Sequence, residues 1–445
     1  MPDAIVKPIQ LTTATKIALC VFFVALAVFF LNANRGAYHS FFSDDDLDHM
    51  GNAREASAPY YLRALALPRL GGEQNFRAAA HAYYWIMVRT ADLDIKKYIA
   101  GIHAIHLVNV GLVFWLALLL GAGPAAACGA ALLFTFSMAT FDVFWNTMYI
   151  FELLCTTFIL LSLITYVRGY LIVSLIFFWL ALKSKEIAIA LPVVLAAYEY
   201  WLGERKWKRI LPFFAISLLM GVQAIRENAG RDNDYSLRFT LAALRKTTQF
   251  YSGALLFIPW AGLSILAIPL LFRNRKVWFG VLMFFAFFGM MLVLPGRLFA
   301  AYFYLPLAGL AIALSAVKRP AWLLLFFAIW IPWNYSHLRT LRTDHLKLAN
   351  DRRFWFRPVA AFAEAHPEID TYIFDGAPAN FMSYGVIGAL ENIRVNQPTR
   401  TQWIHDPEAA ELMKAPRYGL ITWDYGTHHS HVDLKEAAPP IAKSP

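Results

Sequence analysis

The chain has 445 residues, of which 59% are hydrophobic and only 16% are charged. Soluble domains carry about a quarter charged residues, and the mean hydropathy here is +0.48, so an ordinary water-soluble globular protein is excluded. The formal net charge of +10 does not indicate a nucleic-acid partner, because the basic residues are spread over the gaps between apolar runs. The composition predicts an integral membrane protein.

Runs of roughly 20 apolar residues predict membrane-spanning helices. We expect a polytopic α-helical membrane domain over 1–336, with an outer-face loop at 34–97 and a further helix at 79–90 that is either interfacial or partly inserted. About eleven transmembrane helices are predicted, at 16–33, 98–120, 124–141, 149–167, 170–183, 186–202, 209–225, 250–272, 277–295, 299–317 and 320–336. A cleaved signal peptide is the alternative interpretation of the first run, which has a basic flank.

The distribution of basic turns predicts an orientation. If the N-terminus is cytoplasmic, the basic turns at 202–209, 273–276 and 318–319 all face the cytoplasm, as the positive-inside rule requires. The acidic segment after the first helix and the tail from residue 337 then lie outside. We therefore expect a multi-pass protein of the bacterial inner membrane with a periplasmic or otherwise extracytoplasmic C-terminal domain.

Residues 337–445 have the composition of a soluble domain and predict a small α/β fold. Pro and Gly separate the predicted elements. These are helices at 355–366 and 380–391 and strands at 370–375 and 418–424.

The most informative segment is the acidic cluster that follows the first helix, with Asp44, Asp45 and Asp46 in sequence and Asp48 and His49 close behind. Crowded carboxylates repel one another unless a cation, a basic group or water relieves them. The cluster could supply a general base of raised pKa, or bind Mg or Mn through Asp44 and Asp46. A solvated acidic loop or a helix cap is the alternative.

Several other apolar runs end in polar residues on the predicted outer side, where such groups are costly and often functional. They could form one pocket, in which Arg and Lys would bind an anion such as phosphate. These residues are Arg77, His103, His106, Asn109, Asp142, Trp145, Glu152, Lys185, Glu186 and Arg297.

Each polar residue also has a structural interpretation. His106 and Asn109 could form interhelical hydrogen bonds, and Lys185 could be an interfacial anchor. Arg297 could mark a helix end, and Glu152 could pair with a neighbouring base.

The order of these motifs resembles that of the GT-C superfamily of membrane glycosyltransferases, in particular the branch of the protein O-mannosyltransferases and their tetratricopeptide-bearing relatives. That branch has an acidic pair after the first helix, a basic residue before the second, a His-x-x-His-x-x-Asn motif, an acid and Trp, a Ser-Lys-Glu motif, and an Arg before Tyr-Leu-Pro-Leu-x-Gly. The matching positions here are Asp44 to Asp46, Arg77, His103, His106, Asn109, Asp142, Trp145, Ser184 to Glu186, Arg297 and Tyr304 to Gly309.

The resemblance implies transfer of a hexosyl or pentosyl group from a polyprenyl-phosphate donor to a hydroxyl of a protein, lipid or glycan. It implies a base among Asp44, Asp45 and Asp46, and it requires no cofactor, although Mg or Mn is compatible with Asp44 and Asp46. Arg77, Lys185 and Arg297 would contact the donor phosphate. The remaining pocket residues would be His103, His106, Asn109, Asp142, Trp145, Glu152, Glu186 and Tyr304.

The chain departs from this family in three ways: it has three consecutive aspartates, it has Asp142 where Glu is more usual, and no repeats follow. Two other functions remain alternatives. One is a transporter or flippase of a lipid-linked sugar, and the other is a non-catalytic assembly protein with the same fold.

Overall fold

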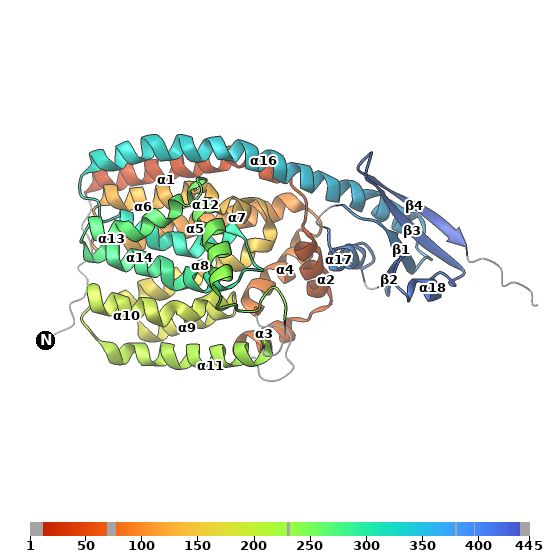
Figure 1. Ribbon diagram of the computed structural model, residues 1–445, viewed down its shortest axis with the longest axis horizontal. Helices are drawn as coiled ribbons and strands as arrows, with labels where there is room; N and C mark the ends of the chain where they lie inside the picture. Colours follow the sequence, from red (N-terminus) through yellow and green to blue (C-terminus); the bar gives the residue numbers. More distant parts are fainter. Residues whose placement is uncertain (1–11, 69–76, 229–231, 379–380, 396, 437–445) are drawn as a thin grey trace, which may run out of the picture.

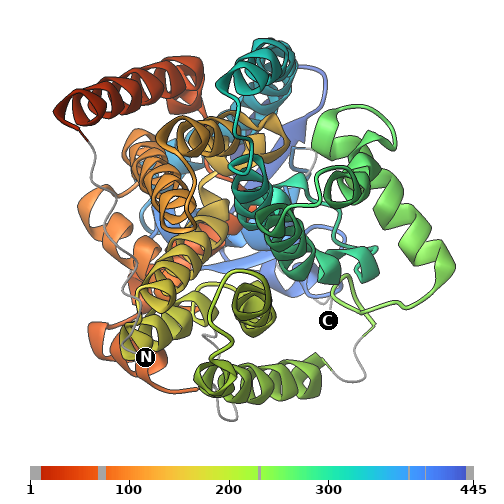
Figure 2. The same cartoon turned by 90° about the vertical axis from the view of Figure 1, so that its left-hand side faces the viewer.

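The computed structural model describes residues 12–68, 77–228, 232–378, 381–395 and 397–436. A long helical bundle forms most of the molecule, and a small sheet domain lies at one end of it (Figure 1). Seen from the end that lies away from the sheet domain, many of the bundle helices run roughly along the line of sight (Figure 2). Since α2, α3 and α4 lie between the bundle and the sheet domain, we call this the capped end (Figure 1).

The helices of the first half of the chain are α1 (Thr13–Ala33), η1 (Arg35–His39), α2 (Asp44–Glu55), α3 (Ala58–Ala66), α4 (Ala78–Thr90), α5 (Ile95–Leu119), α6 (Pro124–Phe136), η2 (Met138–Thr140), α7 (Phe141–Trp145), η3 (Thr147–Tyr149), α8 (Ile150–Val167), α9 (Leu171–Leu182), η4 (Glu186–Ala190) and α10 (Leu191–Trp201). The η elements are short 3-10 helices. The predicted helix at 79–90 is confirmed as α4.

The bundle continues with η5 (Trp207–Ile210), α11 (Leu211–Asn228), α12 (Leu241–Leu256), η6 (Ala261–Ala267), α13 (Ile268–Leu271), α14 (Arg275–Phe288), η7 (Gly289–Val293), η8 (Ala300–Phe303), α15 (Tyr304–Leu314) and α16 (Pro320–Ala365). The sheet domain contains β1 (Thr371–Asp375), α17 (Ser383–Ile393), β2 (Arg400–Trp403), α18 (Ala409–Leu412), β3 (Arg417–Asp424) and β4 (His429–Glu436).

Among the described residues, five helical segments are long and apolar enough to cross a membrane, or up to seven if each of two bent pairs is one span. The predicted number of eleven is not confirmed. One reason is local: the predicted helix at 250–272 turns by 90° between α12 and the following segment, where Phe257 and Trp260 have left-handed φ angles of 57° and 64°. A second bend, of 42°, interrupts the predicted helix at 124–141.

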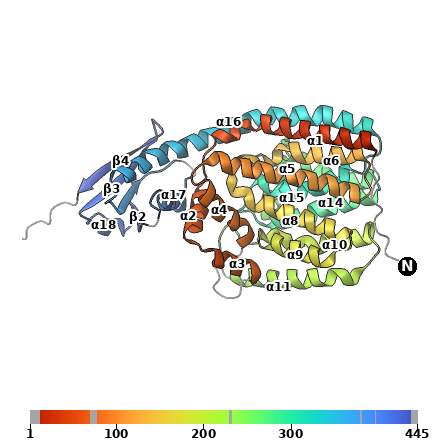
Figure 3. The same cartoon turned by 180° about the vertical axis from the view of Figure 1, so that it is seen from behind.

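Two helices on one edge of the bundle present apolar side chains outward. Helices α1 and α16 both run along that edge (Figures 1 and 3), and α1 exposes Val21 and Val28 while α16 exposes Leu324 and Ile329. An extended, exposed apolar face marks contact with a membrane or a partner. Together with the long apolar helices, it indicates a protein embedded in a membrane.

Helix α16 corrects the predicted boundary after residue 336. The helices predicted at 320–336 and 355–366 form one helix of 46 residues, which reaches ~69 Å at 1.5 Å per residue and connects the bundle to the sheet (Figure 1). The polar stretch 337–353 contains neither Gly nor Pro, so nothing in it ends a helix.

The sheet has the strand order β2-β1-β3-β4, with β1 parallel to β2 and β3, and β3 antiparallel to β4. The predicted strands at 370–375 and 418–424 are confirmed as β1 and β3, and the predicted helix at 380–391 is confirmed as α17 with shifted ends. Strands β2 and β4 were not predicted, because edge strands rich in polar residues carry little apolar signal.

Candidate functional site

Helix α2 begins at the acidic cluster. Ser43 is its N-cap and forms a capping box with Asp46, so the cap interpretation of the cluster applies to Asp46. The Asp46 carboxylate is fully buried and accepts hydrogen bonds from the Ser43 backbone and hydroxyl, from the Tyr84 hydroxyl at 2.7 Å and from the Thr147 hydroxyl at 2.5 Å. Burial raises the pKa of Asp46, although these donors act to lower it.

The three aspartates point to different partners because successive residues on a helix are about 100° apart. Asp44 is buried, accepts a hydrogen bond from the Met382 backbone and lies 3.9 Å from Arg352. Asp45 is partly exposed and accepts a hydrogen bond from the Tyr384 hydroxyl at 2.8 Å on one oxygen, Oδ1. No described residue donates a hydrogen bond to its other oxygen, so Asp45 is the acid of the three that is least engaged.

The sheet domain holds α2 in place through α17. A Cβ on Gly385 would lie 2.2 Å from Asp44 Cβ, and one on Gly388 would lie 2.6 Å from the Asp48 nitrogen, so the two helices touch at their backbones. Asn392 of α17 donates a hydrogen bond to the Leu47 carbonyl at 2.7 Å. The acidic cluster is therefore fixed between the bundle and the sheet domain.

Two ion pairs stand next to this cluster. Arg77, which precedes α4, donates two hydrogen bonds to Glu186, at 2.8 and 2.9 Å. Lys185 pairs with Glu152. Burial alone would raise the pKa of Glu186, but Arg77 outweighs it and holds that pKa below its usual value.

Lys185 and Arg297 share an aromatic neighbour. The Lys185 ammonium lies 4.6 Å from the centre of the Tyr302 ring, and Arg297 Nε donates to the Tyr302 hydroxyl at 3.2 Å. The Arg297 guanidinium also lies 4.5 Å from the ring of Tyr235 and 4.7 Å from that of Phe299. These contacts fix the position of the two cations, since a cation over a ring face is attracted by its quadrupole.

Arg297 is the cation of this group that is free of a carboxylate partner within the described part of the chain. Burial would lower its pKa, but Tyr302, Tyr235 and the negative charge of Asp45 raise it, and the net shift is upward. We call Asp45, Glu152, Lys185, Arg297 and Tyr302 the charged site.

A group of aromatic and imidazole rings connects α2 to Arg77. The Phe151 ring contacts the rings of His49 and His81, each at 5.1 Å, and lies 5.4 Å from the Arg77 guanidinium. Burial, and then the positive charge of Arg77, lowers the pKa of His49 to about 4. Burial also lowers the pKa of His81. Both imidazoles are therefore neutral at pH 7.

Four predicted pocket residues form a separate, neutral cluster inside the bundle. His106 and Asn109 hydrogen-bond to the Tyr304 hydroxyl at 2.8 and 3.2 Å, and His103 bonds to the Phe144 carbonyl at 3.0 Å. All four side chains are buried. His103, His106 and Asn109 lie on α5 and bond to residues of α7 and α15, as in the interhelical interpretation of these residues. We call them the neutral cluster.

Trp145 and Asp142 lie on α7. The Trp145 indole donates to Asn34 at 2.8 Å and is fully buried, so it ties α7 to the end of α1. Asp142 lies one turn earlier and is partly exposed. Among the described residues, neither forms a hydrogen bond or an ion pair with a residue of the charged site.

The prediction from sequence missed several residues that complete the site. Tyr302 follows Arg297 by five positions, and this short separation in sequence was the signal that could have included Tyr302 in the site. Tyr84 and Thr147, which hold Asp46, and Tyr384, which holds Asp45, gave no local signal because their partners are distant in sequence.

Both Asp46 oxygens accept hydrogen bonds, and Asp44 lies against Met382 and Arg352, while metal binding by these two residues stays a prediction. Among the described residues, no group of three or more His, Cys, Asp or Glu side chains is arranged to hold a metal ion.

A scan against protein-family models finds no match, and a search of curated proteins finds no similar sequence. The chemistry of the site is therefore inferred from the residues of this chain.

Proposed function

We propose that the protein is a glycosyltransferase that moves a sugar from a polyprenyl-phosphate donor to an acceptor hydroxyl at the capped end of the bundle, on the extracytoplasmic side of the membrane. The proposal depends on one observation: Arg297 and Lys185 contact the same tyrosine, Tyr302, and Arg297 has no carboxylate partner among the described residues. A partly exposed acid and two fixed cations are the groups that this transfer needs. The order of motifs that resembles the GT-C superfamily supports the same reaction.

In the proposed step, Asp45 accepts the proton of the acceptor hydroxyl, and the oxygen forms a bond to the anomeric carbon of the sugar. The bond between that carbon and the phosphate oxygen breaks, and its electron pair leaves with the lipid phosphate. Tyr384 donates to one Asp45 oxygen, which orients the carboxylate and leaves the other oxygen for the acceptor. Such a single displacement inverts the anomeric centre.

The leaving phosphate gains negative charge, and cations placed beforehand stabilise it without reorganising. Arg297 suits this role best, because it lacks a carboxylate partner among the described residues and a guanidinium binds phosphate bidentately. Lys185, held over Tyr302, would be the second contact. Arg77 is engaged by Glu186 through both ends of its guanidinium, so we assign it a positioning role.

The test uses the purified full-length protein in proteoliposomes. Donors are a panel of radiolabelled hexosyl- and pentosyl-phosphate polyprenols, membrane extract supplies the acceptors, and release of polyprenyl phosphate is measured. We expect release with at least one donor, and expect Asp45→Asn to abolish it while Asp44→Asn retains part of it. Full activity in Asp44→Asn, Asp45→Asn and Asp46→Asn alike would exclude the mechanism.

A further inference from the structure

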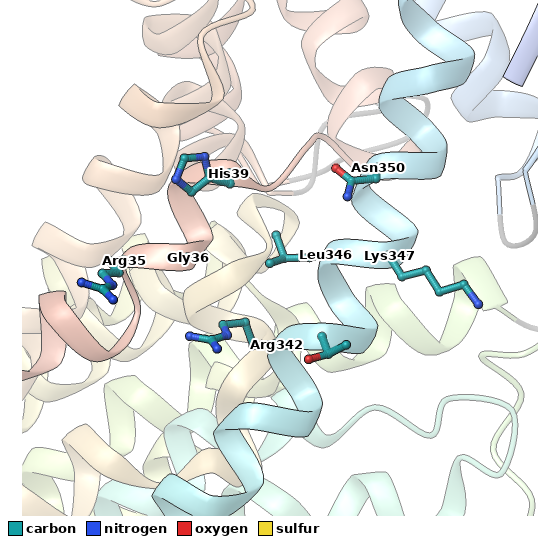
Figure 4. A pocket seen from close by; sticks show the side chains of 8 residues that line it. Arg35, Gly36, His39, Arg342, Leu346, Lys347 and Asn350 are labelled. Atoms are coloured by element: carbon teal, nitrogen blue, oxygen red, sulfur yellow. The ribbon is translucent and has the colours of Figure 1, made fainter. Parts of the chain in front are cut away.

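A second polar site lies on the opposite side of η1 from the neutral cluster, between η1 and the middle of α16. It is a groove of about 700 Å³, shown in Figure 4. The lining residues used below are Arg35, Gly36, His39, Arg342, Leu346 and Asn350. None of them belongs to the charged site.

The groove is positively charged. Arg342 extends from α16 toward η1, which carries Arg35, whereas Lys347 points away from η1 (Figure 4). Within the described ranges, neither arginine forms an ion pair with a carboxylate. Two guanidinium groups that face one groove repel each other, so an anion between them would relieve the repulsion.

The groove lies where the lipid-facing surface ends. Arg35 comes two residues after the last residue of α1, and the last turns of α1 expose Val28 and Phe29. On α16, Tyr335 stacks on Phe29 at 6.4 Å and precedes Arg342 by about two turns. Exposed aromatic residues at such a border mark the headgroup level of a membrane.

The two walls of the groove are held together by specific contacts. A Cβ on Gly36 would lie 2.6 Å from the Trp145 ring and 3.1 Å from Arg342 Cδ, so a larger residue here would collide with Trp145 and press on Arg342. Ser40 hydrogen-bonds to His345 at 2.6 Å, and Arg353 donates to the His39 and Ser40 carbonyls at 2.7 and 2.8 Å. The groove is therefore preorganised by the fold.

Membrane topology does not account for these cations. Basic residues that set orientation gather on the cytoplasmic side, whereas this groove lies toward the capped end, which we place outside. A ligand with negative charge at the headgroup level accounts for both the charge and the position.

We propose that the groove binds the phosphate group of an anionic membrane lipid, which enters from the bilayer along α1 and α16. Arg35 and Arg342 bind the phosphate oxygens, Asn350 and His39 lie within reach of the polar headgroup, and Leu346 contacts its apolar part. This site does not depend on the proposed transfer reaction, because it lies apart from the charged site and its occupant is not consumed.

The test places the full-length protein in nanodiscs that contain phosphatidylcholine with about one-tenth phosphatidylglycerol, and counts the phosphatidylglycerol that remains bound after detergent extraction by native mass spectrometry. We expect wild type to retain it, and Arg35→Gln and Arg342→Gln each to lower retention about tenfold, since a charge-assisted hydrogen bond contributes about 1.4 kcal/mol or more. Arg339→Gln is the matched control, an exposed arginine on the same helix that does not line the groove.

Equal retention in wild type and both groove variants would overturn the proposal, and so would an equal loss in Arg339→Gln. A second arm adds glycerol phosphate or inorganic phosphate at millimolar concentration. If neither soluble anion displaces the lipid, a lipid site is supported. If glycerol phosphate or inorganic phosphate displaces the lipid with the same affinity as the lipid itself, the groove binds free phosphate instead.

Discussion

The charged site and the neutral cluster are both made of polar residues on helices of the same bundle, yet they differ in what their side chains contact. In the neutral cluster, His106 and Asn109 each hydrogen-bond to the Tyr304 hydroxyl, while His106 Nε2 is buried without a hydrogen-bond partner among the described residues. In the charged site, Arg297 has no carboxylate partner among the described residues, and Asp45 has one oxygen without a described donor. Neutral polar groups that hydrogen-bond across helices hold those helices together, whereas a charge without a described ion-pair partner at the capped end is available to a substrate.

The largest effect expected from this difference is on catalysis. Replacing Asp45 with Asn removes the proposed base, and we expect polyprenyl phosphate release to fall about 10³-fold, within the usual range for general base catalysis. The melting temperature should change little, because Asp45 is partly exposed and Asn still accepts a hydrogen bond from Tyr384. Asp48→Asn on the same helix is the control and should retain activity. Comparable activity in the two variants would remove Asp45 from the mechanism.

The second prediction concerns the phosphate contact. Arg297→Gln should lower the turnover number about 10²-fold, because it removes a preorganised cation from the leaving phosphate. Arg238→Gln is the control, since Arg238 is exposed and pairs with Asp232 in the same region. Steady-state kinetics of polyprenyl phosphate release would give the turnover number and KM of both variants. A rise in KM with an unchanged turnover number in Arg297→Gln would show that the arginine only binds the donor.

A substitution in the neutral cluster should lower stability and leave activity largely unchanged. Tyr304→Phe leaves His106 and Asn109 without their shared partner, and we expect it to lower the free energy of unfolding by about 2 kcal/mol with transfer activity largely preserved. Thermal unfolding in detergent measures the first quantity. Tyr335→Phe, an exposed tyrosine of α16, is the control and should be neutral. Loss of activity at unchanged stability in Tyr304→Phe would place the neutral cluster in the reaction.

The smallest expected effect is a dependence of stability on pH. The pKa of His49 is lowered to about 4, so between pH 6.5 and 4 the unfolded chain binds a proton at this position that the folded protein does not. Stability from this group is therefore complete above pH 6.5 and is lost as the pH falls toward 4, by an amount on the order of 1 kcal/mol at pH 6. His49→Gln should flatten the dependence of the melting temperature on pH. A profile identical to wild type would show that His49 is not responsible.

The membrane-embedded character and much of the sheet domain could be predicted from the sequence, because long apolar runs and alternating strands carry strong local signals. The number of spans could not, since the bend at Phe257 and Trp260 depends on two left-handed residues that an apolar composition conceals. The continuity of α16 was also missed, because polar residues were taken to end a helix that they are able to continue.

The residue types of the candidate site could be proposed from the sequence, but the partners and exposure of each residue could not. Asp44, Asp45 and Asp46 are equivalent in a linear sequence, and only the rotation of α2 and its cap by Ser43 separate a buried structural acid from a partly exposed one. Tyr384, which orients Asp45, comes from a domain 339 residues further along the chain. Contacts of this kind are set by tertiary packing and leave no local pattern.

The most direct test measures activity and melting temperature on the same preparations of two variants, Asp45→Asn and Tyr304→Phe. Our account predicts that Asp45→Asn loses release of polyprenyl phosphate and keeps the wild-type melting temperature, while Tyr304→Phe loses stability and keeps activity. The reverse result, or an equal loss of both quantities in both variants, would contradict the separation of a reactive charged site from a structural neutral cluster.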